Sequence, residues 1–167
     1  YIEVCGGAGW VLFCYNKIKG QMEVFNDIDG DLINLYRQIN YNCSQLQSEI
    51  DWLQSRELFN QYRYEIENKI ELSDLQRAAR YLYLIKCSFG SNRSSFATAV
   101  KTISNIIDAL PTYQARLKNV IIENRDFESL IKTYDREKAV FYIDPPYVAS
   151  ERYYNKKYVS FNNGDHI

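Results

Sequence analysis

An acid, two prolines and a tyrosine follow an apolar run, and their types suit the binding of an amine. The run occupies residues 140–143, and after it come Asp144, Pro145, Pro146 and Tyr147. Each proline fixes its own φ and keeps the residue before it out of the α region, so the chain should leave the run as a stiff corner. The Asp144 carboxylate and the Pro145 carbonyl could accept the two N–H groups of a flat amino-heteroaromatic ring, while the ring lies against Tyr147. A surface turn that binds nothing is the alternative.

The apolar run itself must position this corner. Its four β-branched and aromatic residues predict a short buried strand. Open α/β sheets bind their ligands outside the carboxyl ends of the strands. We therefore expect residues 144–147 to lie at the ligand-binding edge of a sheet.

A cluster of glycines after the first predicted strand, residues 1–4, is a second candidate site. The turn consists of Cys5, Gly6, Gly7, Ala8 and Gly9. Glycine permits positive φ and close approach of the backbone to a ligand. The spacing is not that of a dinucleotide fingerprint, and no Gly-Lys-Ser/Thr sequence follows, so a phosphate-binding loop is not supported. Glu3 beside the turn favours a cationic or amino-bearing ligand, and a purely structural turn is the alternative.

Acidic residues also follow the second predicted strand, residues 22–25. Asp27 lies about 20 residues beyond the glycine turn, where a nucleotide-binding sheet places an acid for ribose hydroxyls. Asp29 or Asp31 should cap the helix that comes next. A capping role for all three acids is the alternative.

The third predicted strand, residues 119–123, likewise ends close to an acid. Asp126 could accept a hydrogen bond from an adenine amino group, with Phe127 against the ring. Asp126 could also be only the N-cap of a short helix. The residues themselves leave both roles open.

A long stretch with mostly helical periodicity, residues 43–118, separates the second and third strands. Ser73 is the predicted cap of an amphipathic helix, and a later helix should end at Pro111. The loop at residues 88–96 is rich in small polar residues and carries a guanidinium, which suits contacts with phosphates, base edges or an opened base stack. Its candidate DNA-contacting residues are Ser91, Asn92 and Arg93, and a solvated loop is the alternative.

Composition limits the classes to which the protein could belong. With 167 residues, 46% of them hydrophobic and 25% charged, the chain is globular material for about one domain. A net charge of −1 excludes a uniformly basic nucleic-acid binder, although a local patch could serve. Four cysteines without a CxxC pair and a single histidine argue against a metal site and favour reduced thiols in a cytoplasmic protein. No apolar run approaches a membrane span of about 20 residues.

Four motifs in this order resemble those of the Dam-type N6-adenine-specific DNA methyltransferases. They are Glu-x-Cys-Gly-Gly-x-Gly from Glu3, Asn26-Asp27-Ile28-Asp29, Asn124-Arg125-Asp126-Phe127 and Asp144-Pro145-Pro146-Tyr147. The last motif is the most specific, and the resemblance covers nearly the whole chain. The family commonly has Pro-Phe where this chain has Val4-Cys5.

The resemblance implies an α/β fold, namely a Rossmann-like S-adenosylmethionine-dependent methyltransferase sheet with a helical target-recognition insertion, incomplete at both ends. Residues 1–42 and 119–167 would form the methyltransferase domain, and residues 43–118 the insertion. We then expect a piece of a longer bacterial or phage-encoded protein, active at full length and weak or inactive alone. DNA is the implied partner, and a cognate restriction endonuclease is a further candidate.

The same resemblance implies roles for the residues singled out above. Glu3 and the turn from Cys5 to Gly9 would line the methionine end of S-adenosylmethionine. Asp27 would hold the ribose hydroxyls, and Asp126 and Phe127 the adenine. Asp144, Pro145, Pro146 and Tyr147 would be catalytic, with Asp144 also adjoining the cofactor.

The implied reaction is direct methyl transfer to the exocyclic nitrogen of adenine. Asp144 and the Pro145 carbonyl would accept its N–H groups and stabilise the positive charge that develops on it. A base in a duplex must first be flipped out, and Tyr147 would give it a surface to lie on. The alternatives are methylation of cytosine N4 or of RNA adenine, or an inactive remnant that binds cofactor or DNA.

Overall fold

The computed structural model describes residues 1–145, so Pro146 and Tyr147 lie outside the described residues. The chain divides into two compact units. One comprises Tyr1–Ile33 and the chain from Asn119 onward, and the other is Asn34–Lys118. The first boundary falls inside helix α2 (Gly30–Tyr41), whereas the sequence suggested a boundary after residue 42.

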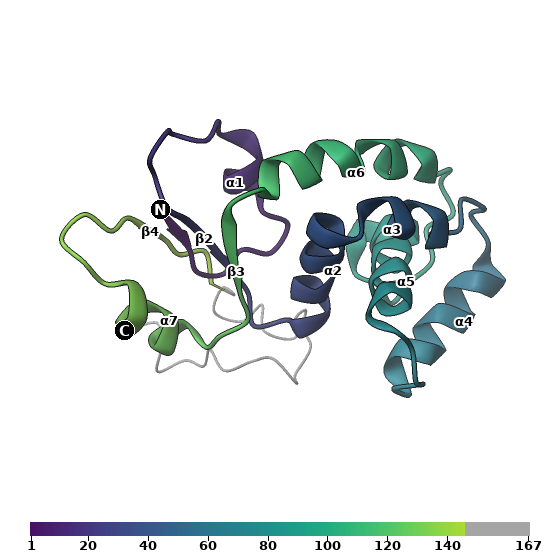
Figure 1. Cartoon of the computed structure of the whole chain (residues 1–167). Helices are drawn as coiled ribbons and strands as arrows, with labels where there is room; N and C mark the ends of the chain where they lie inside the picture. The colour runs from purple at the N-terminus through teal and green to yellow at the C-terminus, as the bar shows by residue number, and fades with distance from the viewer. Residues whose placement is uncertain (146–167) are drawn as a thin grey trace. The chain divides into compact units, whose positions relative to one another are not determined.

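Within residues 1–145, four parallel strands form one sheet in the order β3–β2–β1–β4. Figure 1 labels β2, β3 and β4 of this sheet. The strands are β1 (Ile2–Glu3), β2 (Glu23–Asn26), β3 (Val120–Glu123) and β4 (Phe141–Tyr142). The chain proceeds from β1 through β2 to β3 and then returns to the other side of β1 as β4. The order therefore reverses between β1 and β4, and open α/β sheets bind ligands at such a switch point. The expected Rossmann-like α/β class is confirmed.

The sheet is held by a small apolar core. Helix α1 (Trp10–Cys14) connects β1 to β2, and helix α7 (Phe127–Tyr134) connects β3 to β4. Side chains from the strands and from α7 pack together in one buried cluster, which contains Ile2, Val4, Val24, Leu130 and Tyr134. Burial of these side chains fixes the strands relative to α7, and hence the positions of the strand ends.

The last strand is less buried than the sequence indicated. Val140, Tyr142 and Ile143 are 60%, 38% and 46% exposed, so the prediction of a buried strand was wrong. The reason is that β4 is the edge of the sheet in the described part of the chain, where it pairs with β1. The pairing is regular: Ile2 N–H donates to Val140 O at 2.8 Å, and Val4 N–H donates to Tyr142 O at 2.9 Å.

The second unit is helical. Its elements are α3 (Cys43–Glu49), α4 (Arg56–Glu67), α5 (Asp74–Cys87), the 3-10 turn η1 (Phe89–Ser91) and α6 (Ile103–Leu117). Helix α5 packs against α3, α4 and α6. Ser73 caps α5 as predicted, because its Oγ accepts the Gln76 N–H at 3.1 Å and the Gln76 Oε1 accepts the Ser73 N–H at 3.1 Å. None of the helices in residues 1–145 combines the length and the apolar character needed to cross a membrane.

Helix α6 does not end at Pro111, as the sequence predicted, but continues to Leu117. A proline has no N–H, so the carbonyl four residues earlier, that of Ile107, loses its helical donor. The side chain of Gln47 supplies another donor, with Nε2 at 2.9 Å from the Ile107 O. This long-range bond compensates for the proline, and the periodicity of the sequence could not reveal it.

Replacement of Gln47 by leucine should lower the free energy of unfolding by about 1 kcal/mol, because the Ile107 carbonyl loses its donor. Pro111→Ala gives the same carbonyl a backbone N–H, so Gln47→Leu should cost less in that background. Denaturant unfolding of the two single variants, the double variant and the parent measures the coupling. Equal costs in both backgrounds would show that Gln47 does not act through this carbonyl.

Candidate functional site

The turn after β1 is shaped by its glycines. Gly9 N–H donates to Gly6 O at 2.8 Å and closes the turn, and Gly6 N–H donates to Asn26 O at 2.8 Å. A Cβ on Gly6 would lie 2.2 Å from the ring of Phe25, so no larger residue fits there without displacing the ring. Gly7 has a φ of 50°, and a Cβ on it would meet no described atom within 4 Å. The backbone of the turn is therefore fixed at Gly6 and open at Gly7.

Asp27 lies at the tip of β2 and fastens this turn. Its Oδ2 accepts the Gly7 N–H at 2.9 Å, and its Oδ1 accepts the Asp29 N–H at 2.8 Å. Burial raises the pKa of the Asp27 carboxyl above its usual value, although the N–H groups of Asp29 and Gly7 oppose the shift. Asp29 caps α2, with Oδ1 accepting the Asp31 N–H at 3.0 Å and the Leu32 N–H at 3.3 Å. Asp27 is thus distinct from the cap.

Asp144 follows β4 and lies within electrostatic reach of the glycine turn. Strands β1 and β4 pair in register, so Cys5 and Asp144 leave the sheet from neighbouring strand ends. Burial, with the negative charges of Asp27 and Asp144, raises the pKa of the Cys5 thiol to about 12. Asp144 is exposed and Pro145 is half-buried. The structure thus brings together the acids predicted after β2 and β4, around the turn that follows β1.

Glu3 is placed differently from the other predicted ligand residues. Its side chain is buried, and its Oε2 accepts the Leu12 N–H at 3.1 Å and the Tyr1 O–H at 3.0 Å. Glu3 therefore anchors α1 to β1 from within the fold. Ala8, in the turn itself, is exposed.

Asp126 caps α7, because its carboxylate accepts the Glu128 N–H at 3.0 Å. Phe127 is partly buried and packs against the apolar cluster formed by the strands and α7. Asn124 joins this loop to the tip of β2, with Nδ2 donating to Asp27 O at 2.8 Å and to Ile28 O at 3.2 Å. The cap is confirmed, and the role of Asp126 toward an adenine remains a prediction.

Asn26 belongs to one of the motifs in the sequence, but no role was predicted for it; it is 1% exposed at the end of β2. Its Nδ2 donates to Val4 O at 2.8 Å and to Arg125 O at 3.0 Å, and its Oδ1 accepts the Arg125 N–H at 2.8 Å. The sequence showed only that a polar residue stands at the end of a strand. Such residues are too common to predict that this side chain bonds to the segments of Val4 and Arg125.

The candidate DNA-contacting residues lie in the second unit, in a loop closed by an antiparallel bridge between Ser88 and Phe96. Ser91 and Arg93 have φ values of 58° and 59°, a conformation that non-glycine residues adopt at a cost. The Arg93 N–H donates to Ser88 Oγ at 3.0 Å, and the Arg93 guanidinium lies 4.5 Å from the centre of the Tyr81 ring. The strained backbone is thus held by specific contacts.

Asn92 organises the tip of the same loop. Its Oδ1 accepts the N–H groups of Ser94 and Ser95 at 2.9 and 3.0 Å. Arg63 on α4 adds a bond from Nη1 to Ser94 O at 2.7 Å. Ser91 and Asn92 are exposed and Arg93 is half-buried, so the loop presents polar groups on a pre-organised backbone.

The acidic side chains that follow the strands fit the chemistry of S-adenosylmethionine. The carboxylates of Asp27, Asp126 and Asp144 are hydrogen-bond acceptors, whereas the ammonium, ribose hydroxyl and adenine amino groups of that cofactor are donors. Two acids beside the glycine turn also suit a cationic sulfonium centre. In the described residues, no group of three His, Cys, Asp or Glu side chains is arranged to hold a metal ion.

Comparisons with known proteins identify the family of the chain. Three relatives are type II methyltransferases. M1.LlaDCHI of Lactococcus lactis subsp. cremoris is 26% identical over 89% of the chain. M.MjaIII of Methanocaldococcus jannaschii is 28% identical over 100% of the chain, and M.CviBI of Paramecium bursaria Chlorella virus NC1A is 26% identical over 97%. The chain spans 56%, 66% and 63% of their respective lengths. A family model described as D12 class N6 adenine-specific DNA methyltransferase matches residues 1–166. The chain therefore belongs to the D12 class of N6 adenine-specific DNA methyltransferases.

Proposed function

We propose that the protein transfers a methyl group from S-adenosylmethionine to the exocyclic N6 amino group of adenine in DNA. The observation that carries the proposal is the position of Asp144 at the end of β4, which pairs in register with β1, so that Asp144 and the glycine turn leave neighbouring strand ends at the switch point of the sheet. Membership of the D12 class supports adenine as the target base.

Asp144 and Pro145 act on the target amine in this proposal. The nitrogen is a poor nucleophile because its lone pair is delocalised into the ring. When the Asp144 carboxylate and the Pro145 carbonyl accept its N–H groups, they favour a pyramidal nitrogen and stabilise the positive charge that grows on it. The bound cofactor supplies an electrophilic methyl group. No covalent bond between enzyme and base is needed, and Asp144 acts as a proton acceptor at most after transfer.

The positions of the strand ends support the remaining cofactor contacts of the proposal. The open backbone at Gly7 would accept the methionine end, and Asp27 would hold the ribose hydroxyls with the lone pairs that its backbone bonds leave available. Asp126 and Phe127 would receive the adenine. A DNA base must leave the stack to reach Asp144, and Tyr147, outside the described residues, is proposed to support it.

Identification of the modified base tests the proposal. DNA treated with the protein and S-adenosylmethionine is digested to nucleosides and analysed by mass, and N6-methyladenine is the expected product. N4-methylcytosine as the sole product would show that cytosine, not adenine, is the target. Methylation of RNA alone would show that DNA is not the substrate. Cofactor binding by the full-length protein without any product would indicate a binding remnant.

DNA binding is proposed to involve the loop that contains Ser91, Asn92 and Arg93. If Arg93 meets a phosphate, Arg93→Ala should weaken DNA binding and reduce the slope of log K against log salt by about 1. Arg93→Gln keeps a polar side chain without the positive charge and should give the same change in slope. Titration of a labelled duplex at several salt concentrations measures both quantities.

Lys132 provides the control for this experiment. It is an exposed cation on α7 in the first unit, 3.4 Å from Glu128. Lys132→Ala should leave the salt slope unchanged, because this lysine is assigned no DNA contact. If Arg93→Ala and Lys132→Ala alter the slope equally, the effect is one of total charge and the assignment of the loop fails.

A further inference from the structure

Asn26 connects the three segments that surround the candidate cofactor site. Its backbone O accepts the Gly6 N–H at 2.8 Å, and its Nδ2 donates to Val4 O at 2.8 Å. The same side chain binds both backbone groups of Arg125, with Nδ2 at 3.0 Å from the O and Oδ1 at 2.8 Å from the N. Strands β2 and β3 pair as far as Asn26 and Glu123. Beyond that point, the amide of Asn26 continues the connection between them.

Each group that Asn26 holds is next in sequence to a residue proposed to bind the cofactor. Val4 precedes Cys5 in the glycine turn, and Arg125 precedes Asp126. Asn26 itself precedes Asp27. A shift of any of these bonds would therefore displace one part of the site relative to the others, although Asn26 is buried and contacts the site only through the backbone.

We propose that Asn26 is a positioning residue, which sets the spacing between the glycine turn, Asp27 and the Asp126 loop and thereby the affinity for cofactor. The inference rests on the proposed function, because it assumes that S-adenosylmethionine occupies these segments. An amide is required at this position, since it offers two donors to two carbonyl oxygens and one acceptor to an N–H group. Aspartate has the same shape, but when ionised it offers no donor and places a negative charge against both carbonyls.

Asn26→Asp should weaken the binding of S-adenosylmethionine by about tenfold or more, because the buried carbonyl oxygens of Val4 and Arg125 lose the donor that holds these segments in place. Calorimetric titration of the full chain with S-adenosylmethionine, at a temperature where both proteins are folded, measures the dissociation constants. Hydrogen exchange of the Gly6 and Arg125 amides should increase in the variant. With the cofactor saturating, the turnover number should change less than the dissociation constant.

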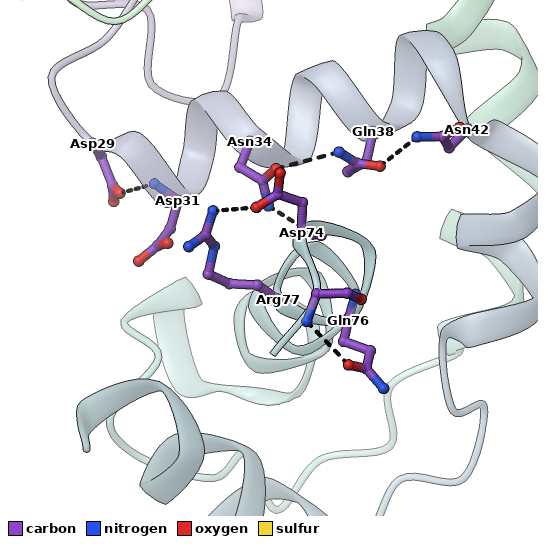
Figure 2. A network of polar contacts seen from close by, with 9 residues as sticks. Asp29, Asp31, Asn34, Gln38, Asn42, Asp74, Gln76 and Arg77 are labelled. Atoms are coloured by element: carbon purple, nitrogen blue, oxygen red, sulfur yellow. Dashed lines mark hydrogen bonds and ion pairs between the residues drawn. The ribbon is translucent and has the colours of Figure 1, made fainter. Parts of the chain in front are cut away.

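Asn34 offers a matched control (Figure 2). It is 6% exposed, and its Nδ2 donates to a backbone carbonyl, Asp74 O, at 2.8 Å within the helical unit. Asn34 also accepts from Gln38, which in turn accepts from Asn42 (Figure 2). Asn34→Asp should reduce stability through the same loss of a buried donor, yet leave the affinity for cofactor within about twofold, since no part of the proposed site depends on it.

The pH dependence separates a positioning role from general destabilisation. A protonated aspartic acid regains one O–H donor, so the affinity ratio between Asn26→Asp and the parent should narrow as the pH falls. A milder variant, Asn124→Ala, removes the hydrogen bond from Asn124 to the Asp27 carbonyl, which also connects Asp27 to the Asp126 loop. It should weaken the binding of S-adenosylmethionine as well, so the proposal can be tested even if Asn26→Asp does not fold.

The outcomes distinguish this inference from the proposed function. Unchanged affinity in folded Asn26→Asp, or equal losses in Asn26→Asp and Asn34→Asp, would overturn the positioning role and leave the proposed function in place. A parent protein that binds no S-adenosylmethionine would remove the proposed function, and the positioning role with it. Weakened binding confined to Asn26→Asp and Asn124→Ala supports the inference.

Discussion

Asp144→Ala is expected to reduce the rate of methyl transfer by about 10²–10³-fold, the usual cost of removing one group that stabilises developing charge. The affinity for S-adenosylmethionine should change little, because Asp144 is exposed at the end of β4 and its main role is toward the target amine. Single-turnover transfer to a DNA duplex gives the rate, and calorimetry gives the affinity. A large loss of affinity with normal turnover would mean that Asp144 serves the cofactor instead.

Two further variants refine this experiment. Asp144→Asn keeps the shape of the side chain and one acceptor oxygen but removes the negative charge, so its rate of transfer should lie between those of the parent and Asp144→Ala. Asp135→Ala removes an exposed carboxylate at the end of α7 and should keep normal activity. If Asp135→Ala lost as much activity as Asp144→Ala, the loss could not be attributed to the corner after β4.

Asp27→Ala should raise the dissociation constant of S-adenosylmethionine by about 10- to 100-fold. The change removes the proposed ribose acceptor, and it also releases the N–H groups of Gly7 and Asp29. Hydrogen bonds to charged groups contribute about 1.5–3 kcal/mol each, and each 1.4 kcal/mol is a factor of ten in affinity. The turnover number with saturating cofactor should fall less than the affinity.

Asp29→Ala is the control, because Asp29 caps α2. It should lower the free energy of unfolding by about 0.5–2 kcal/mol and have a smaller effect on binding. If Asp27→Ala and Asp29→Ala change the affinity equally, Asp27 has only a structural role and does not bind the ribose.

The raised pKa of Asp27 adds a pH dependence with a defined sign. As the pH falls through that raised value, the carboxyl gains a proton and loses its charge, so the parent should bind S-adenosylmethionine more weakly. Asp27→Ala lacks this titration, so the difference between the two proteins should shrink toward low pH. Calorimetry over a pH series measures the dissociation constants of both proteins. If their ratio does not change with pH, the ionised form of Asp27 is not the one that binds.

Much of the site could be predicted because parallel strands end at a common edge. The sequence placed Cys5, Asp27, Asp126 and Asp144 just after four apolar segments, and the fold gathers strand ends without further information. The cap at Ser73 was equally accessible, since capping acts between residues three apart. Local spacing carried these predictions.

The tertiary structure alone decided the features that depend on distant partners. Residues 140–143 read as a buried strand, but their burial is set by what lies beside β4, and in the described residues that is one strand. Pro111 stands inside α6 because Gln47, from another helix, binds the carbonyl that the proline leaves free. A pattern of residue types specifies neither of these neighbours.

Asn26 shows most clearly which features the sequence determined and which the tertiary structure decided. By itself the sequence determined the family motifs, the parallel sheet and the acids at its edge, because these follow from local periodicity and residue type. The partner of the Asn26 amide, Arg125, lies 99 residues away, and the pairing requires strands β2 and β3 to meet in one register. A hydrogen bond over that separation is decided by the packed fold, since the chain between the two residues places no local constraint on their meeting.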